Sequence, residues 1–276
     1  MIDLHLHTTA SDGRLTPTEL VRRAAACGVH VLAVTDHDTT EGIDEAAVEA
    51  VRLGLELIPG IEVTAVEGGR DVHMLGYFFD TRDERLLRFL IGQRATRITR
   101  IAEMAARLNE LGLPVDVQPI LDDARTHHMR SVGRPTLARA MVEAGHVATT
   151  REAFDLWLGQ DRPAFVERAG PSPEDVISVL HAAGGIVSLA HPGRTKIDAR
   201  IAPLGAAGLD AIEAYHSDHD EPTVQGYVEL ARQLDLLVSG GSDFHGHPGH
   251  GLEPGASTLP QPDWERLSSA REKHGR

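Results

Sequence analysis

Histidines close to carboxylates follow the predicted strands of this 276-residue chain, and this pattern constrains the fold more than any other feature. The segments that carry it are His5-Leu6-His7 with Asp12, Asp36-His37-Asp38, and Asp243-Phe244-His245. Imidazole and carboxylate groups together hold divalent cations, and a cluster of such cations serves to transfer phosphate or to hydrolyse esters. The fold is therefore expected to bring distant segments to one metal-binding pocket.

A strand followed by a helix recurs along much of the chain. Residues 2–7 alternate apolar and polar side chains as a strand does, and Thr16-Pro17-Thr18-Glu19 predicts a helix that begins with a capping box. Further strands are predicted at 29–35, 55–66, 72–79, 185–190, 209–214 and 236–239. About seven strands alternating with helices favour a parallel α/β barrel or an open sheet, with chemistry at the carboxyl ends of the strands.

The segment between about residues 81 and 165 interrupts this alternation. Residues 85–111 are rich in arginine and have helical periodicity, and three shorter helix-like stretches follow them. Because no strand is predicted among them, we expect a small helical subdomain at 81–165. It would be inserted into a barrel that comprises residues 1–80 and 166–276.

Composition restricts the partners and the compartment. The net charge of −14 argues against a basic surface that grips long duplex nucleic acid. The chain contains no uninterrupted run of roughly 18 apolar residues, so the sequence predicts no membrane span. The single cysteine, Cys27, excludes an internal disulfide, and the N-terminal residues do not resemble a secretion signal. We therefore expect a cytoplasmic protein that does not contact membranes.

Each predicted strand brings a possible ligand to its carboxyl end or just beyond it. These candidates are His5, His7, Asp12, His37, Glu62, His73, His191, Glu213, His216, Asp243 and His245. A single His-x-His pair is weak evidence, because alternation along a strand also places two ordinary surface histidines on one face. Such residues at five strand ends are not explained by scattered histidines, so the whole set predicts metal binding.

Several motifs resemble the successive motifs of the polymerase and histidinol phosphatase (PHP) superfamily. They are His5-Leu6-His7-Thr8 with Ser11-Asp12-Gly13, Thr35-Asp36-His37-Asp38, Gly60-Ile61-Glu62, Ala190-His191-Pro192 and Ser242-Asp243-Phe244-His245-Gly246. The resemblance extends from residue 2 to about residue 246 and keeps the family's order. The helical insertion with Gly133-Arg134-Pro135 resembles, more narrowly, the branch of nucleoside 3′,5′-bisphosphate phosphatase and the 5′→3′ exoribonuclease RNase AM.

The resemblance implies a distorted (β/α)7 barrel with three divalent metal ions. It places the first ion on His5, His7, Glu62 and Asp243, the second on Glu62, His73 and His191, and the third on Asp12, His37 and His245. A bridging carboxylate suits two cations about 3.5 to 4 Å apart. Mixed nitrogen and oxygen ligation without thiolate suits Mn²⁺, Fe²⁺ or Zn²⁺, and among these we expect Mn²⁺.

Hydrolysis is expected to proceed by in-line attack of a metal-bound hydroxide on phosphorus, without a protein nucleophile. Asp38 is a candidate to approach the metal-bound water, or else to cap the following helix. Arg134, Arg194 and Lys196 are candidates to bind phosphate, and the two arginines are also candidates for the catalytic set. His216 is expected to contact phosphate or to protonate the leaving group, unless it is a structural histidine.

Small hydroxyl residues beside the ligands have a structural interpretation. Thr8, Ser11 and Ser242 are expected to cap turns and orient carboxylates rather than to act as nucleophiles. One position departs from the pattern of this branch. Its members often have a histidine after Gly-Arg-Pro, whereas this chain has Thr136 after Pro135. This difference leaves open how the second phosphate or the base of a substrate is bound.

The resemblance favours a metal-dependent phosphoesterase that removes phosphate from nucleoside 3′,5′-bisphosphates or releases 5′-nucleotides from short 5′-phosphorylated RNA. A histidinol-phosphatase-like monoesterase is the alternative among enzymes, and the insertion with Arg134 favours nucleotides over it. A non-catalytic module that binds metal or nucleotide is the alternative of another class, which the complete ligand set disfavours. The sequence identifies no protein partner and no oligomeric state.

Overall fold

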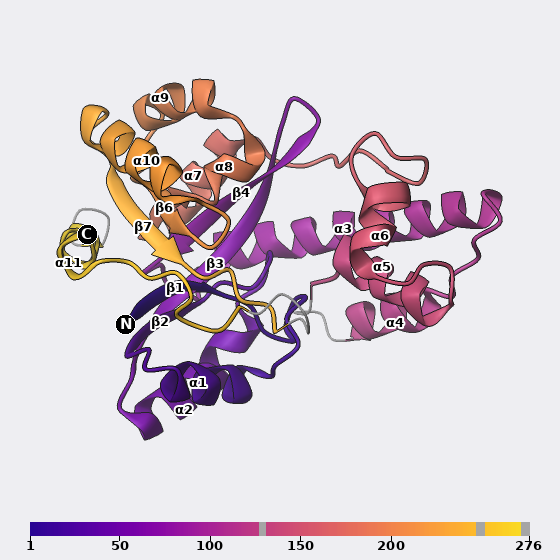
Figure 1. Cartoon of the computed structure of the whole chain (residues 1–276), viewed down its shortest axis with the longest axis horizontal. Helices are drawn as coiled ribbons and strands as arrows, with labels where there is room; N and C mark the ends of the chain where they lie inside the picture. The colour runs from indigo at the N-terminus through magenta and orange to yellow at the C-terminus, as the bar shows by residue number, and fades with distance from the viewer. Residues whose placement is uncertain (127–130, 247–251, 272–276) are drawn as a thin grey trace.

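One seven-stranded sheet, curled into a nearly closed barrel, forms the centre of the computed structural model, which describes residues 1–126, 131–246 and 252–271 (Figure 1). In spatial order the strands are β1 (Ile2–Leu6), β2 (Val31–Val34), β3 (Glu56–Glu67), β4 (Arg70–Tyr77), β5 (Ile186–Leu189), β6 (Ala211–His216) and β7 (Leu237–Gly241). The seam between the first and last strands is joined by a parallel bridge between Leu6 and Phe244. The predicted α/β barrel is confirmed.

The expectation of an all-parallel sheet is wrong for β4. This strand pairs antiparallel with both β3 and β5, because a two-residue turn at Gly68 and Gly69 reverses the chain. Both glycines have positive φ angles, 56° and 77°, as the favoured two-residue hairpin turns require. His73 consequently lies within β4, opposite Thr64, and not beyond the carboxyl end of a parallel strand.

Helices surround the barrel on its outer side (Figure 1). They are α1 (Pro17–Ala26), α2 (Glu41–Leu53), α7 (Pro173–Ala182), α8 (Pro192–Thr195), α9 (Asp198–Ala206), α10 (Glu221–Gln233) and α11 (Gln261–Ala270). The capping box predicted at Thr16 and Glu19 is present at the start of α1, and α2 ends at Gly54 in the left-handed conformation. Across the described residues, no helix is long and apolar enough to cross a bilayer.

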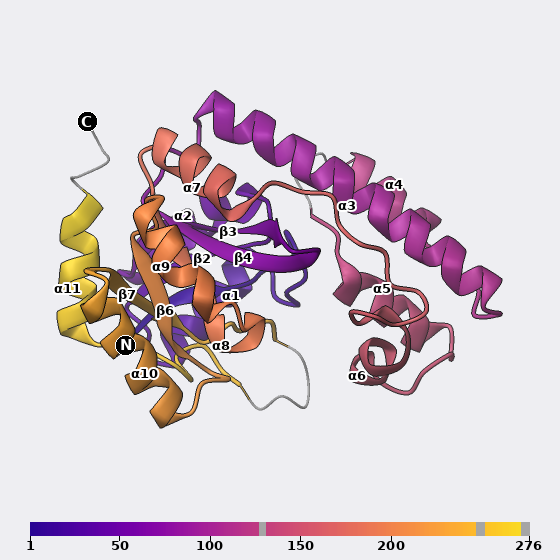
Figure 2. The ribbon, with the colours of Figure 1, turned by 90° about the horizontal axis from the view of Figure 1, so that it is seen from above.

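The chain between β4 and α7 forms a group of helices beside the barrel (Figures 1 and 2). Its elements are α3 (Glu84–Glu110), α4 (Gln118–Thr126), α5 (Arg134–Glu143), α6 (Thr150–Ala153) and a π-helical turn, η1 (Phe154–Leu158). Leu86 and Leu90 of α3 pack into the barrel core, whereas Ile101 and Met104 belong to a separate apolar cluster. Helix α3 therefore anchors the other helices to the barrel. The boundaries of the inserted helical subdomain at residues 81 and 165 stay a prediction.

A glycine and a buried aspartate allow β1 and β7 to approach closely. Asp3 accepts hydrogen bonds from the amide of Ser242 at 2.9 Å, from the Ser242 hydroxyl at 2.6 Å and from the amide of Gly255 at 2.7 Å. A Cβ atom at Gly241 would lie 2.4 Å from the amide nitrogen of His5. Glycine at 241 is therefore required for the seam that carries His5.

We predict that Gly241→Ala lowers the free energy of unfolding by at least about 2 kcal/mol, because the added methyl group must displace backbone. Urea denaturation measures this change. Gly226→Ala is the matched control: Gly226 is exposed within α10, no atom lies within 4 Å of its added Cβ, and alanine favours a helix. Equal stability of the two variants would contradict the close approach at the seam.

Candidate metal centre

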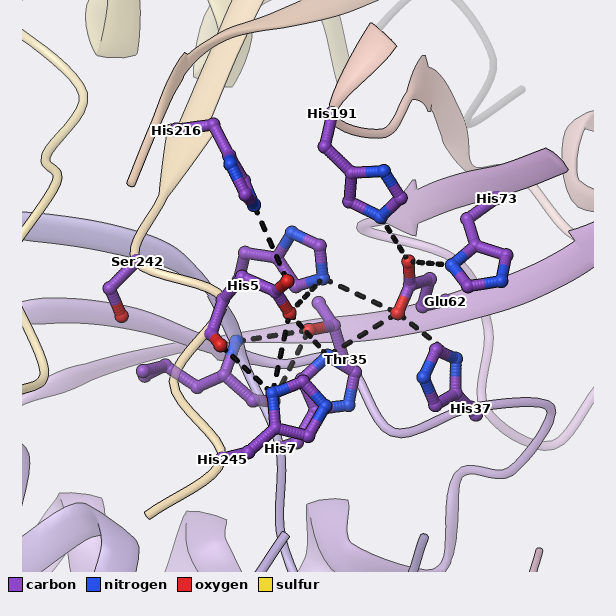
Figure 3. A network of polar contacts seen from close by, with 12 residues as sticks. His5, His7, Thr35, His37, Glu62, His73, His191, His216, Ser242 and His245 are labelled. Carbon is purple, nitrogen blue, oxygen red and sulfur yellow. Dashed lines mark hydrogen bonds and ion pairs between the residues drawn. The ribbon is translucent and has the colours of Figure 1, made fainter. Parts of the chain in front are cut away.

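The carboxylate of Glu62 lies at the centre of a cluster of imidazoles (Figure 3). Glu62 is buried in the middle of β3, and ring nitrogens lie 2.7 to 3.4 Å from its two oxygens. These nitrogens belong to His73 and His191 around Oε1, and to His5, His7 and His37 around Oε2. One carboxylate thus contacts five histidines from four separate segments of the barrel.

The remaining predicted ligands join the same cluster. Asp243 Oδ1 lies 3.4 Å from His5 Nε2 and 3.2 Å from His7 Nε2. Asp12 Oδ1 lies 3.3 Å from the Nε2 atom of His245. The structure therefore brings every residue of the predicted metal set into one connected group at the mouth of the barrel.

Four subsets of these side chains can each surround one cation, since their ligand atoms lie within 4.8 Å of one another. They are His7, Asp12, His37 and His245; His5, His216 and Asp243; His5, Glu62 and His191; and His37, Glu62 and His73. The first subset contains the predicted third-metal group and adds His7. Glu62 belongs to two of the subsets, as a bridging carboxylate would.

Backbone geometry directs several of these side chains into the mouth. His191 and Asp243 have positive φ angles of 27° and 54°, which residues other than glycine rarely adopt. Asp36 accepts hydrogen bonds from the hydroxyls of Thr8 at 2.6 Å and Ser11 at 2.5 Å, and so fixes the loop that carries Asp12. The interpretation of these hydroxyls as orienting groups agrees with those contacts.

Hydrogen bonds on the outer ring nitrogens indicate which imidazoles present a lone pair to the cluster. Nδ1 of His5 donates to the buried carboxylate of Glu213 at 2.8 Å, and Nδ1 of His245 donates to the carbonyl oxygen of Asp243 at 2.9 Å. Each ring therefore carries its proton on Nδ1 and directs a basic Nε2 inward, as metal ligands do. Glu213, a possible ligand from its strand position, orients His5 instead.

His216 has the opposite arrangement. Its Nδ1 accepts a hydrogen bond from the amide of Asp218 at 3.0 Å, so the proton of the neutral ring lies on Nε2. That Nε2 lies 3.4 Å from Oδ2 of Asp243. His216 is therefore arranged as a hydrogen-bond donor toward the cluster and not as a ligand.

The inward-facing atoms fit divalent cations. Among the described residues, buried atoms without a hydrogen-bond partner include His5 Nε2, both ring nitrogens of His7, His37 Nδ1, His73 Nδ1 and Glu62 Oε2. Burial opposes protonation of His7, yet the carboxylates of Asp243 and Glu62, at 3.2 and 3.3 Å from its Nε2, raise its pKa to about 10. Burial lowers the pKa of His191 to about 4, so that ring is neutral. The buried carboxylates thus require positive charge, which either protons or cations supply.

A cavity of about 390 Å³ extends from this cluster to the insertion. Besides Glu62, the cavity is lined by four arginines: Arg97 and Arg100 of α3, Arg134 at the start of α5, and Arg168. Arg100 and Arg134 share the carboxylate of Asp71, with contacts of 2.9 and 3.0 Å. We call these four arginines the arginine wall.

The other predicted substrate residues lie in different places. Arg194 is half exposed, lies 3.3 Å from Oδ2 of Asp243 and lines the cavity. Lys196 is exposed and does not line this cavity. Thr136, at the position that departs from the branch, accepts a hydrogen bond from Arg139 at 3.2 Å. Arg139 also donates to the carbonyl oxygen of Asp12 at 3.2 Å, so this pair supports the loop of a predicted ligand.

Comparisons with known proteins identify the family. A family model described as "PHP domain" matches residues 3–129. A 5′-3′ exoribonuclease from Haemophilus influenzae is 39% identical over 248 residues, which cover 88% of this chain and 89% of the relative. The chain belongs to the PHP domain family. A 3′,5′-nucleoside bisphosphate phosphatase from Chromobacterium violaceum is 35% identical over 278 residues, which cover 97% and 96% of the two chains.

A solved structure extends the match to three dimensions. A protein from Bifidobacterium adolescentis, to which metal-dependent phosphoesterase activity is ascribed, superposes with a TM-score of 0.88 at 33% sequence identity. The match covers 97% of this chain and 95% of the other. The predicted family, the barrel and the assignment as a metal-dependent phosphoesterase are confirmed. The PHP chain is thus a hydrolase of phosphate esters.

Asp38 occupies a different place from the one expected of a residue near the metal-bound water. Its Oδ2 lies 2.5 Å from Nε of Arg97 and 3.0 Å from Nη2 of Arg168, and its Oδ1 accepts from the amide of Thr64 at 2.9 Å. It does not cap α2 either, because the N-terminal cap is Thr40. Burial alone would raise the pKa of Asp38, but the two guanidinium groups hold it well below its usual range. Asp38 therefore positions arginines.

Sequence reasoning did not identify Arg97, Arg100, Arg168 or Asp71 as part of the site. A weak signal existed for three of them. Arg97 and Arg100 are three residues apart and so share one face of a helix, while Asp71 and His73 alternate along one face of a strand. Arg168 lies in a connecting segment, where periodicity gives no information.

We predict that Asp38→Ala lowers the free energy of unfolding of the metal-free protein by about 3 to 5 kcal/mol, because two buried guanidinium groups lose their counterion. Urea denaturation after chelation measures the loss. Glu84→Ala is the control, since it removes an exposed ion pair with Arg88 and is expected to change little. Unchanged stability together with abolished hydrolysis would instead favour the direct catalytic role predicted for Asp38.

Proposed function

We propose that this PHP phosphoesterase removes the 3′-phosphoryl group of 5′-phosphorylated nucleotides. Its substrates are nucleoside 3′,5′-bisphosphates or short 5′-phosphorylated RNA, and its product is a 5′-nucleotide. One observation carries the proposal: the arginine wall lines the same cavity as the histidine and carboxylate cluster. The activities named for the two relatives from Haemophilus and Chromobacterium support it.

The charges of the arginine wall favour a substrate with a second anionic group. Four guanidinium groups of Arg97, Arg100, Arg134 and Arg168 face two carboxylates, so two positive charges are uncompensated. Nε of Arg168 is buried and has no hydrogen-bond partner among the described residues. Burial lowers the pKa of Arg134 to about 10, which still leaves it charged at neutral pH. A terminal phosphate supplies the missing acceptors and charge.

The cluster at the other end of the cavity is proposed to hold three divalent ions, with Mn²⁺ as the natural metal. The ligands are His5, His7, Asp12, His37, Glu62, His73, His191, Asp243 and His245. When bound, such ions acidify a water molecule and neutralise charge on phosphoryl oxygens. The imidazoles and carboxylates bind and orient, while Glu213 holds the ring of His5 in the tautomer that leaves Nε2 basic.

His216 and Arg194 are proposed to contact the reacting phosphate. Nε2 of His216 carries a proton directed at the cluster, and hydrogen bonding to Asp243 contributes to a raised pKa against the effect of burial. The ring can therefore donate to a phosphoryl oxygen or to the departing 3′-oxygen. Arg194 lies 3.3 Å from the same oxygen of Asp243 and offers a half-exposed cation beside it. Lys196, outside the cavity, has no support for this role.

We predict that Arg134→Ala raises KM for a nucleoside 3′,5′-bisphosphate by about 10- to 100-fold, the size expected for a lost charge-assisted hydrogen bond. The same variant should leave hydrolysis of the nucleoside 3′-monophosphate nearly unchanged, since this substrate has no second phosphate for Arg134. Steady-state phosphate release with both substrates and added Mn²⁺ measures the effect. Arg82→Ala, an exposed arginine outside the cavity, is the control.

Two outcomes would contradict the proposed function. One is equal turnover of bisphosphate and monophosphate by the unaltered enzyme, which would remove the role of the arginine wall. The other is faster turnover of histidinol phosphate than of either nucleotide, which would favour the amino-alcohol monoesterase.

A location in the cytoplasm stays a prediction.

We also predict that Mn²⁺ affinity falls as the pH is lowered. In the absence of cations His7 holds a proton up to a pKa of about 10, and this proton must leave before its nitrogen can bind a metal. Between pH 8 and 6 the dissociation constant should therefore rise by about tenfold per unit for each proton released. Calorimetric titration in buffers of different ionisation enthalpy counts these protons, and His146→Gln serves as a control away from the cluster.

A further inference from the structure

The imidazole of His219 connects two segments of the chain that carry site residues. His219 is half-buried and lies between β6 and α10. Its Nδ1 donates a hydrogen bond to the carbonyl oxygen of Ala214 at 2.8 Å, and its Nε2 accepts one from the amide of Gly193 at 3.2 Å. Ala214 belongs to β6 and Gly193 to α8, so one ring joins the strand to the first turn of this short helix.

The two partners fix the protonation of this ring. A carbonyl oxygen can only accept a hydrogen bond and an amide N–H can only donate one, so Nδ1 of His219 carries the proton and Nε2 presents a lone pair. Burial lowers the pKa of His219 below its usual value, although the hydrogen bond to Ala214 opposes this effect. The ring is therefore neutral at neutral pH, and both of its nitrogens have partners.

Neighbouring groups leave the ring of His219 little room to move. Its centre lies 5.3 Å from that of the His216 ring and 5.4 Å from that of the Tyr227 ring in α10. A Cβ atom at Gly193 would lie 2.8 Å from Nε2 of His219 and 2.9 Å from its Cδ2. Side-chain carbons do not approach other atoms so closely, so glycine at 193 is what allows the turn of α8 to reach the ring.

The turn that His219 holds also carries Arg194. The amide of Arg194 donates to the carbonyl oxygen of His191 at 2.9 Å, and its guanidinium group lies 3.3 Å from Oδ2 of Asp243. His191 has a separate support, because its own amide donates to the buried carboxylate of Glu213 at 2.7 Å. Loss of the contacts of His219 would therefore release Arg194 while the predicted metal ligand stays fixed.

We propose that His219 is a positioning residue for phosphate binding, because its neutral ring ties the first turn of α8 to β6 and so holds Arg194 beside the metal centre. The proposal rests on the proposed function, in which Arg194 contacts the reacting phosphate. A half-exposed arginine side chain loses conformational entropy when it is ordered on an anion, and a backbone fixed in advance lowers this cost. His219 thus acts on phosphate affinity through Arg194 and takes no part in bond breaking.

Two substitutions of similar size test this role. His219→Gln keeps an oxygen that can accept from the amide of Gly193, whereas His219→Leu fills the space with neither a donor nor an acceptor. With Mn²⁺ present, His219→Leu should raise KM for a nucleoside 3′,5′-bisphosphate about three- to tenfold, as the loss of one hydrogen bond predicts, and should change kcat less than about twofold. His219→Gln should keep KM within about twofold of the unaltered enzyme.

A double-mutant cycle with Arg194→Ala shows whether His219 acts through Arg194. In a chain that already lacks the side chain of Arg194, His219→Leu should raise KM less than about twofold. Gly193→Ala leaves His219 in the chain but displaces its ring, so it should raise KM as His219→Leu does. His181→Leu is the matched control: His181 is also a half-buried imidazole with a hydrogen bond, but its partner, Asp210, lies at the opposite end of β6.

Binding of inorganic phosphate gives a second readout that does not depend on turnover of a nucleotide. Calorimetric titration of the Mn²⁺-loaded protein with phosphate should show about three- to tenfold weaker binding in His219→Leu and nearly unchanged binding in His219→Gln. The metal content should be equal in both variants, since Glu213 and not His219 supports His191. A circular dichroism melt of each variant shows whether the fold is retained.

The outcomes separate this proposal from the one on which it rests. Raised KM and weaker phosphate binding in His219→Leu, both reversed in His219→Gln, support the positioning role. Phosphate affinity that is equal in His219→Leu and the unaltered enzyme, or undetectable in both, overturns it, as do full additivity with Arg194→Ala and a loss of metal from His219→Leu. Failure of the unaltered enzyme to hydrolyse the bisphosphate overturns the proposed function alone, because phosphate binding still reports on His219.

Discussion

The burial of one carboxylate among imidazoles is the constraint on which the structure depends. Glu62 is almost completely buried, and its two oxygens face ring nitrogens from β1, β2, β4 and β5 or from the residues that follow them. A charge cannot be buried at this position without cations or protons beside it. The arrangement of the strands can therefore be understood as the way in which a nearly closed barrel collects enough nitrogen atoms around one acidic centre.

Buried ion pairs also join the insertion to the barrel. Asp38 follows β2 in the barrel, whereas Arg97 belongs to α3 and Arg168 to the segment that leads back from the insertion to α7. Asp71 of β4 makes equivalent contacts with Arg100 and Arg134. The carboxylates orient guanidinium groups that would otherwise be buried alone, and the number of arginines exceeds that of carboxylates. The same network that attaches the helices thus leaves a positively charged wall for an anionic substrate.

Two cavities with different linings adjoin the metal centre. One space leads from the cluster to the arginine wall, and the other leads away along α6 and the end of β6. The insertion supplies Arg134, Phe154 and Thr150 to the walls of these cavities, whereas the barrel supplies the histidine and carboxylate cluster.

The sequence by itself determined the family, the strands, the long helix and the predicted ligands, because strand periodicity, capping residues and His-Asp motifs are local patterns. Tertiary structure decided the rest. The direction of β4 depends on a hairpin turn, the proton on His216 depends on an amide from Asp218, and the role of Asp38 depends on arginines 59 and 130 residues away. Charge compensation, tautomers and cavity shape arise from contacts between distant segments, and a linear pattern does not contain those contacts.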